Sequence, residues 1–102
     1  MPTIEIIWSP TALEHLQVIY DYILDDNPAA AMDVHEEIER STGLLKDNPR
    51  LGRPGRVADT RELVVPAYTN YIIVYDIQGH RVHILAVMHG RQSWPESFGG
   101  ND

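Results

Sequence analysis

The chain has 102 residues, 43% of them apolar, no cysteine and a formal net charge of −7. This length supports one domain with one core, the lack of cysteine excludes a disulfide framework or a thiolate metal site, and the acidic charge argues against non-specific binding to nucleic acid or anionic membranes. No apolar run approaches the roughly 20 residues that span a bilayer, and the N-terminus lacks a signal-peptide pattern, so we expect a cytoplasmic protein with no membrane partner.

The N-terminal part of the chain predicts a strand followed by two helices. Apolar residues alternate over residues 4–8, which is typical of a strand. Ser9-Pro10 and Asn27-Pro28 each place a capping residue before a proline, and this pair of residues is a common start of a helix. Apolar residues at helical spacing follow both starts. We therefore expect an amphipathic helical hairpin with a very short link.

Charge is distributed unevenly along the sequence. Residues 1–49 carry ten acidic and two basic side chains, whereas residues 50–102 carry five acidic and six basic ones. A solvated acidic face of the helices explains the first group better than a metal site does. The histidines of the second half are too widely spaced to share one ion, so we expect neither a metal nor a cofactor.

The remaining sequence predicts a loop and then a meander of strands. Residues 50–60 contain two glycines, one proline and three arginines without an apolar period, which indicates a loop. Three apolar runs rich in Val, Ile and Tyr then predict consecutive antiparallel strands, at residues 61–65, 71–77 and 81–89. Gln78-Gly79-His80 is expected to form the tight corner between the last two strands.

Together these elements predict an α+β domain over residues 1–95. Their order is β-α-α-β-β-β, with an antiparallel sheet backed by the helical hairpin. Residues 96–102 are predicted to form a frayed tail.

Both faces of the last two predicted strands are largely apolar. Strict alternation places Val82, Ile84, Ala86 and Met88 together on one face of the final strand. Because the helices can cover only one face of the sheet, we expect the other face to await a partner.

Six segments of the chain are distinctive in their order and spacing. They are WSPTALEHLQVIYDYI, DNPAAA, NPRLGRPGRV, TRELVV, YIIVYDI and VHILAVMHGRQSWP. With these segments the chain resembles the RelE/ParE superfamily over about residues 4–95. The resemblance implies a toxin of a bacterial type II toxin-antitoxin module, inhibiting growth unless a cognate antitoxin holds it in a hetero-oligomer.

The resemblance also implies one of two mechanisms. RelE-like members cleave messenger RNA in the ribosome without a metal, whereas ParE-like members are not nucleases and poison DNA gyrase. RelE-like nucleases place an arginine near the start of the penultimate strand and two lysines on the strand before it. Here residues 71–75 contain no arginine, residues 61–65 contain no lysine, and Lys46, the only lysine, lies in the second predicted helix.

The sequence therefore favours the ParE branch, in which the protein is a binding inhibitor of gyrase and no enzyme. The alternative is a RelE-like, ribosome-dependent mRNA interferase, which would be a metal-independent endoribonuclease. A third possibility is a decayed, non-toxic binding domain.

If the chain is a ribonuclease, we expect its catalytic residues to be His89, Arg91, Tyr68 and Tyr71. A neutral histidine and an arginine two residues apart could deprotonate a substrate and stabilise the charge that develops. The alternative is that His89 and Arg91 end a strand and face solvent or a neighbouring loop. Arg61 is expected at the opposite end of the sheet, roughly 20 Å away.

The residues that we expect to bind the antitoxin or the cellular target are Arg50, Arg53, Arg56, Arg61, Arg91 and Trp94. Arginine side chains pair well with carboxylates and phosphates because the guanidinium presents two parallel donors. The alternative is that the arginines pair within the chain, with the acidic helices.

Overall fold

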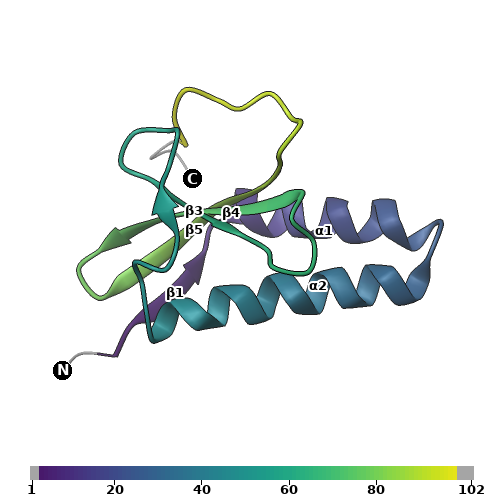
Figure 1. Ribbon diagram of the computed structural model, residues 1–102, viewed down its shortest axis with the longest axis horizontal. Coiled ribbons are helices and arrows are strands. Elements are labelled where there is room, and N and C mark those ends of the chain that lie inside the picture. Colours follow the sequence, from purple (N-terminus) through teal and green to yellow (C-terminus); the bar gives the residue numbers. More distant parts are fainter. Residues whose placement is uncertain (1–2, 99–102) are drawn as a thin grey trace.

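A helical hairpin packs on one face of a five-stranded sheet in the computed structural model, which describes residues 3–98 (Figure 1). The hairpin consists of α1 (Pro10–Leu24) and α2 (Pro28–Gly43), which continues into the short 3-10 helix η1 (Leu44–Lys46). The strands are β1 (Glu5–Trp8), β2 (Arg53–Pro54), β3 (Arg61–Val64), β4 (Tyr71–Gln78) and β5 (Arg81–His89), arranged in the order β1-β5-β4-β3-β2.

The predicted helix starts are confirmed by side-chain caps. The hydroxyl of Ser9 accepts a hydrogen bond from the Ala12 N–H at 3.0 Å, and the side chain of Asn27 accepts one from the Ala30 N–H at 3.1 Å. Each cap satisfies one of the N–H groups that the first turn of a helix leaves free. Because the cap of α2 at Asn27 lies only a few residues after the end of α1 at Leu24, the link between the two helices is very short.

The antiparallel meander of β3, β4 and β5 is confirmed, but the sheet as a whole is mixed. β1 pairs parallel to β5, with Ile6 opposite Val82, so the prediction of an antiparallel sheet is wrong for this strand. The helical hairpin is the crossover that a parallel neighbour requires. The predicted loop is also interrupted, because Arg53 and Pro54 pair with β3.

A bulge at Leu85 divides the faces of β5. Tyr75 pairs with Ile84 and Val74 pairs with Ala86, which leaves Leu85 as an extra residue. Before the bulge Val82 and Ile84 face the helices, and after it Val87 does, whereas Ala86 and Met88 belong to a second apolar cluster. The strict alternation expected for this strand is therefore wrong beyond Leu85, and each face of the sheet receives part of the strand.

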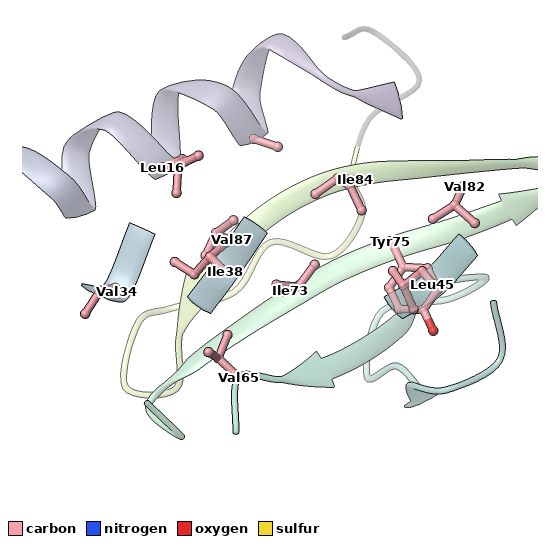
Figure 2. Packing of buried hydrophobic residues seen from close by; sticks show 11 residues of the cluster. Leu16, Val34, Ile38, Leu45, Val65, Ile73, Tyr75, Val82, Ile84 and Val87 are labelled. Carbon is pink, nitrogen blue, oxygen red and sulfur yellow. The ribbon is translucent and has the colours of Figure 1, made fainter. Parts of the chain in front are cut away.

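The main core lies between the hairpin and the sheet (Figure 2). Leu16 from α1 and Ile38 from α2 point toward Ile73 and Val87 of the central strands, as Figure 2 shows. Ile38 and Ile73 are fully buried. Burying a side chain of this size stabilises the fold by about 1.5–3 kcal/mol, so this layer supplies most of the apolar driving force.

Side chains close the part of β5 that β1 does not reach. β1 ends at the level of Ile84, so among residues 3–98 no strand pairs with β5 on that side beyond this residue. There the Val87 N–H donates to Nδ1 of His15 at 3.2 Å, and the His89 N–H donates to Oε1 of Gln92 at 2.6 Å. The two N–H groups on this unpaired strand edge are thus satisfied by side-chain acceptors.

Tyr75 connects the sheet to the loop that follows η1. The side chain is fully buried, and its hydroxyl donates to the Pro49 carbonyl at 2.7 Å and accepts from the Gly52 N–H at 2.9 Å. Gly52 is required here, because a Cβ atom would lie 2.7 Å from the Glu62 carbonyl oxygen and 2.8 Å from the Tyr75 hydroxyl. These two hydrogen bonds therefore fix the position of the arginine-rich loop relative to the sheet.

Replacing Tyr75 by Phe is expected to lower the free energy of unfolding by about 1–3 kcal/mol, because the buried Gly52 N–H and the part-buried Pro49 carbonyl lose their partner. Urea unfolding of the variant and of the parent chain measures this difference. The matched control is Tyr22→Phe, because Tyr22 is 76% exposed. Equal stability of the two variants would contradict the role assigned to the Tyr75 hydroxyl.

Candidate functional site

A buried carboxylate organises the arginine-rich loop on the face of the sheet opposite the helices. Glu62 of β3 is only 2% exposed. Its Oε2 accepts from the Arg56 N–H at 2.7 Å and from Arg56 Nε at 3.1 Å, and its Oε1 accepts from Arg53 at 3.1 Å. Of the two alternatives for the loop arginines, pairing within the chain therefore applies to Arg53 and Arg56, although the partner is this strand residue and not the acidic helices.

The protonation of Glu62 is set by two opposing effects. Burial by itself raises the pKa of the carboxyl group, whereas hydrogen bonds from the Arg56 side chain and backbone and from Arg53, together with the charge of Arg56, lower it. The net result is a pKa below the ordinary value of 4.5. Glu62 is therefore a carboxylate at neutral pH, and the cluster of Glu62, Arg53 and Arg56 carries one net positive charge.

Aromatic side chains from the C-terminal segment cover the same face of the sheet. The guanidinium of Arg56 lies 3.7 Å from the centre of the Trp94 ring, and Trp94 meets Phe98 edge to face at 6.4 Å between ring centres. Both rings pack against a small cluster formed by Val74, Ala86 and Met88. The face that was expected to await a partner is thus partly covered by the chain itself.

This covering involves the start of the predicted tail. Residues 96–98 are described, and Phe98 packs on the sheet as stated, whereas residues 99–102 lie outside the described part of the chain. Arg56, with half of its side chain exposed, and Arg53, more exposed still, remain at the rim of this aromatic cover. The result is a shallow surface of cations and aromatic rings.

Arg61 has a different environment from the other loop arginines. Its guanidinium donates to the carbonyl oxygens of Arg50 at 3.1 Å and Gly52 at 2.5 Å, so it ties the loop to β3. The register places Arg61 level with Tyr75 and Ile84. Along β4 it is thus four residues, or roughly 13 Å of strand rise, from the level of Tyr71 and His89, less than the roughly 20 Å expected.

The structure brings together only part of the candidate nuclease set. The rings of Tyr71 and His89 meet edge to face at 5.5 Å, and Nδ1 of His89 accepts from the Arg91 N–H at 3.1 Å. The Arg91 side chain is exposed. Tyr68 points elsewhere, because its hydroxyl hydrogen-bonds the carboxylate of Asp33 on α2. The four residues therefore do not converge on one point.

Neither tyrosine is adjusted for proton transfer at neutral pH. The hydrogen bond to Asp33 raises the pKa of Tyr68, with smaller contributions from desolvation and from the charges of Asp33 and Glu37. Burial raises the pKa of Tyr71, with a further contribution from Tyr22. Both shifts move the phenol away from neutrality, where an acid or base would be most effective.

The sequence reasoning missed Glu62, which organises the candidate site, and the cross-strand pair of Asp76 with His83. Glu62 could have been found as a single acidic residue in an apolar strand that follows an arginine-rich loop, because such a carboxylate needs a cationic partner when buried. The Asp76 carboxylate accepts a hydrogen bond from His83 Nδ1 across β4 and β5 at 3.1 Å. A pairing of this kind depends on strand register, which the sequence does not specify.

Within residues 3–98, no group of three or more His, Asp or Glu side chains is arranged so that it could hold a metal ion. Neither helix described for this chain is long and apolar enough to cross a membrane.

Comparisons with known proteins find one toxin family and two related toxins. A family model described as "ParE toxin of type II toxin-antitoxin system, parDE" matches residues 6–94. The protein Y4kP of Sinorhizobium fredii, named as a toxin, is 45% identical over 89 residues, or 87% of this chain and 91% of that protein. Toxin RelE2 of Caulobacter vibrioides is 33% identical over 85 residues, or 83% of this chain and 93% of its own.

Solved structures share the fold. The chromosomal ParDE toxin-antitoxin system of P. aeruginosa contains a chain with a TM-score of 0.77 and 21% identity, covering 85% of this chain and 96% of its own. The toxin-antitoxin complex RelBE2 of Mycobacterium tuberculosis contains one with a TM-score of 0.57 and 24% identity, covering 87% and 93%.

Replacing Glu62 by Gln tests the buried carboxylate. Because the pKa is lower in the folded than in the unfolded chain, ionised Glu62 stabilises the fold above about pH 4.5, and this stabilisation is lost as the pH falls through the lower folded value. We expect Glu62→Gln to lower the free energy of unfolding by about 1–3 kcal/mol at pH 7.

The difference between parent and variant is expected to shrink below about pH 4, and thermal unfolding between pH 3 and pH 7 measures it. Glu96→Gln, at an exposed position, serves as the control. A difference that stays constant over this pH range would contradict the assignment.

Proposed function

Because the chain belongs to the ParE toxin family of type II toxin-antitoxin systems, we propose that it stops growth by binding and inhibiting DNA gyrase in the cytoplasm. The chain is the toxin of such a module, and an antitoxin is its partner. In this proposal the toxin acts by occupying a protein surface, and it cleaves no RNA.

The proposal rests on one observation, which is that the cationic side chains near the sheet are already paired within the chain. RNA cleavage needs cations directed at a phosphate and an acid and a base near it. Here Arg53 and Arg56 are held by the buried carboxylate of Glu62, and Arg61 by two loop carbonyls. The apolar centre of the same sheet face is covered by Trp94 and Phe98. Such a face suits contact with a protein better than cleavage of RNA.

The candidate nuclease residues support the same conclusion. His89 and Tyr71 are adjacent, but Tyr68 is engaged by Asp33 on α2, and the pKa of each tyrosine is raised. With only a histidine and the exposed Arg91 available, the acid and base that RNA cleavage requires are incomplete.

We propose that the antitoxin neutralises the toxin at the surface of cations and aromatic rings. Arg53, Arg56 and Trp94 are the centre of the proposed surface, and the proposal adds the exposed Arg50 and Arg91 to it. Carboxylates of an antitoxin segment would find guanidinium donors there, with aromatic rings to receive its apolar side chains. Arg61, whose guanidinium is tied to the loop, supports this surface and does not contact the partner.

The first test is induction of the toxin in cells without antitoxin. We expect DNA supercoiling to change and DNA breaks to appear, while transcripts stay intact. Combined replacement His89→Ala with Arg91→Ala is expected to leave growth arrest in place, because neither residue performs chemistry in this mechanism.

For a nuclease, the same double replacement would reduce cleavage by about 10²–10⁴-fold and relieve the arrest. Transcript cleavage that disappears in this variant would therefore overturn the proposal in favour of an mRNA interferase. Unchanged growth on induction of the parent chain would instead identify a non-toxic binding domain.

A second test concerns the antitoxin surface. Reversing the charge at Arg50 or Arg91 is expected to weaken binding of the cognate antitoxin by up to about fivefold each, since exposed charge pairs contribute at most about 1 kcal/mol. Calorimetry with the purified antitoxin measures the change, and Lys46→Glu, an exposed lysine on η1, is the control. Equal affinity of all variants would remove these arginines from the interface.

A further inference from the structure

Three backbone N–H groups at and just after the end of β5 donate to side chains. They belong to alternate residues: the Val87 N–H donates to Nδ1 of His15, the His89 N–H to Oε1 of Gln92, and the Arg91 N–H to Nδ1 of His89. Two of the three acceptors are therefore imidazole rings, which can gain a proton near neutral pH.

One of these imidazoles also joins α1 to β5. The N–H of Ser9, the cap of α1, donates to the Ile84 carbonyl at 3.0 Å, and the Ser9 hydroxyl donates to the Leu85 carbonyl at 3.2 Å. His15 continues this row two residues further along β5, where its Nδ1 lies 3.2 Å from the Val87 nitrogen. The first half of α1 is thus hydrogen-bonded along the part of β5 that β1 does not reach.

Both imidazole bonds require a neutral ring. A ring nitrogen accepts a hydrogen bond only through its lone pair, so Nδ1 of His15 and of His89 carries no proton, and the proton of each neutral ring is on Nε2. A second proton would arrive on Nδ1 and would face the backbone N–H, so two donors would oppose each other. Protonation is therefore incompatible with either bond.

Two other histidines respond to acid in the opposite direction. Nδ1 of His83 lies 3.1 Å from the Asp76 carboxylate, and Nδ1 of His35 lies 2.9 Å from that of Glu39. A carboxylate accepts from a neutral or a charged ring, and the charge-assisted bond is the stronger one. Mild acid therefore removes hydrogen bonds at the end of β5 and retains them at these two pairs.

The surroundings of His15 offer little compensation for a positive charge. The hollow of about 300 Å³ beside it is lined otherwise by hydroxyl, amide, proline and apolar side chains of α1, β5 and the C-terminal segment. The carboxylates next to it in the chain or on the C-terminal segment, Glu14 and Glu96, are exposed, and neither lines this hollow. A protonated His15 would thus lose its backbone partner without gaining a carboxylate in the hollow.

The surroundings of His89 are similar. The hollow of about 360 Å³ beside it is lined by uncharged side chains of α1 and Gln92 and by the phenols of Tyr22 and Tyr71, which are neutral between pH 5 and pH 8. The exposed Arg91 follows closely in the chain and carries a positive charge. No group lining this hollow would therefore stabilise a charged imidazole.

We propose that His15 and His89 form a proton-sensitive switch on the edge of β5. With neutral rings the Val87 and Arg91 N–H groups are bonded, and α1 is joined to β5 through His15. With protonated rings both N–H groups are released, whereas Gln92, which does not titrate, keeps the His89 N–H in either state. The inference is independent of the cellular target proposed above, because it concerns backbone groups of the isolated chain.

Amide hydrogen exchange of the full chain, measured by NMR between pH 5 and pH 8, tests the switch. Each rate is divided by that of an unstructured amide at the same pH, which gives a protection factor. We expect the protection of the Val87 amide to fall about three- to tenfold from pH 8 to pH 5, as for the loss of one hydrogen bond. The amide of Ile73, on the central strand β4, should keep its protection.

Matched variants assign the effect to the imidazoles. His15→Asn keeps an acceptor oxygen near the position of Nδ1 but does not titrate, so protection of Val87 should no longer depend on pH. His15→Phe keeps a ring without an acceptor, so protection should be low throughout. His89→Asn should likewise remove the pH dependence at the Arg91 amide. His80→Asn, at an exposed turn position, is the control and should behave as the parent does.

Four results would overturn the inference. One is protection of Val87 in the parent chain that is equal at pH 5 and pH 8, and another is the same acid response in His15→Asn, which would assign the effect to another group. A third is His15→Phe with the protection of the parent at pH 8. The fourth is an equal loss of protection at Ile73, because acid would then loosen the whole fold and not this edge.

Discussion

The carboxylate of Glu62 is the point on which the outer face of the sheet depends. A buried charge of this kind is tolerated only with cationic partners, and Arg53 and Arg56 provide them from the loop that precedes β3. Once Arg56 is held there, its guanidinium forms the platform on which Trp94 rests. The loop, the strand and the C-terminal segment are therefore one unit, although they are distant in sequence.

The two faces of the sheet are made different by a single extra residue. The bulge at Leu85 lets β5 supply Val82 and Ile84 to the main core and then Ala86 and Met88 to the outer cluster. A strictly alternating strand would keep all four on one face. The outer face thereby becomes apolar enough to retain Trp94 and Phe98, with the cations of Arg53 and Arg56 at its rim.

Local signals in the sequence were sufficient for most of the fold. The caps at Ser9 and Asn27, the apolar periods and the turn at Gly79, which has a positive φ of 62°, depend on neighbouring residues and were predicted correctly. Pairing between distant residues could not be predicted in this way. The parallel contact of β1, the bulge at Leu85 and the partners of Glu62 all depend on register, which arises only when the sheet forms.

The candidate site was predicted as a set of residues, whereas the structure divides this set. Arg53, Arg56 and Trp94 lie together. The Arg61 side chain is bound by loop carbonyls, and the Tyr68 side chain is directed to α2.

The closure of β5 by His15 and Gln92 affects how the chain behaves when it is alone. An unpaired strand edge is a template on which identical chains can add to one another. This matters for a toxin, because it is active only while its antitoxin is absent. With the Val87 and His89 N–H groups already occupied, that stretch of the edge offers no donors for such stacking. At this edge the chain is thereby protected from pairing with further copies of itself.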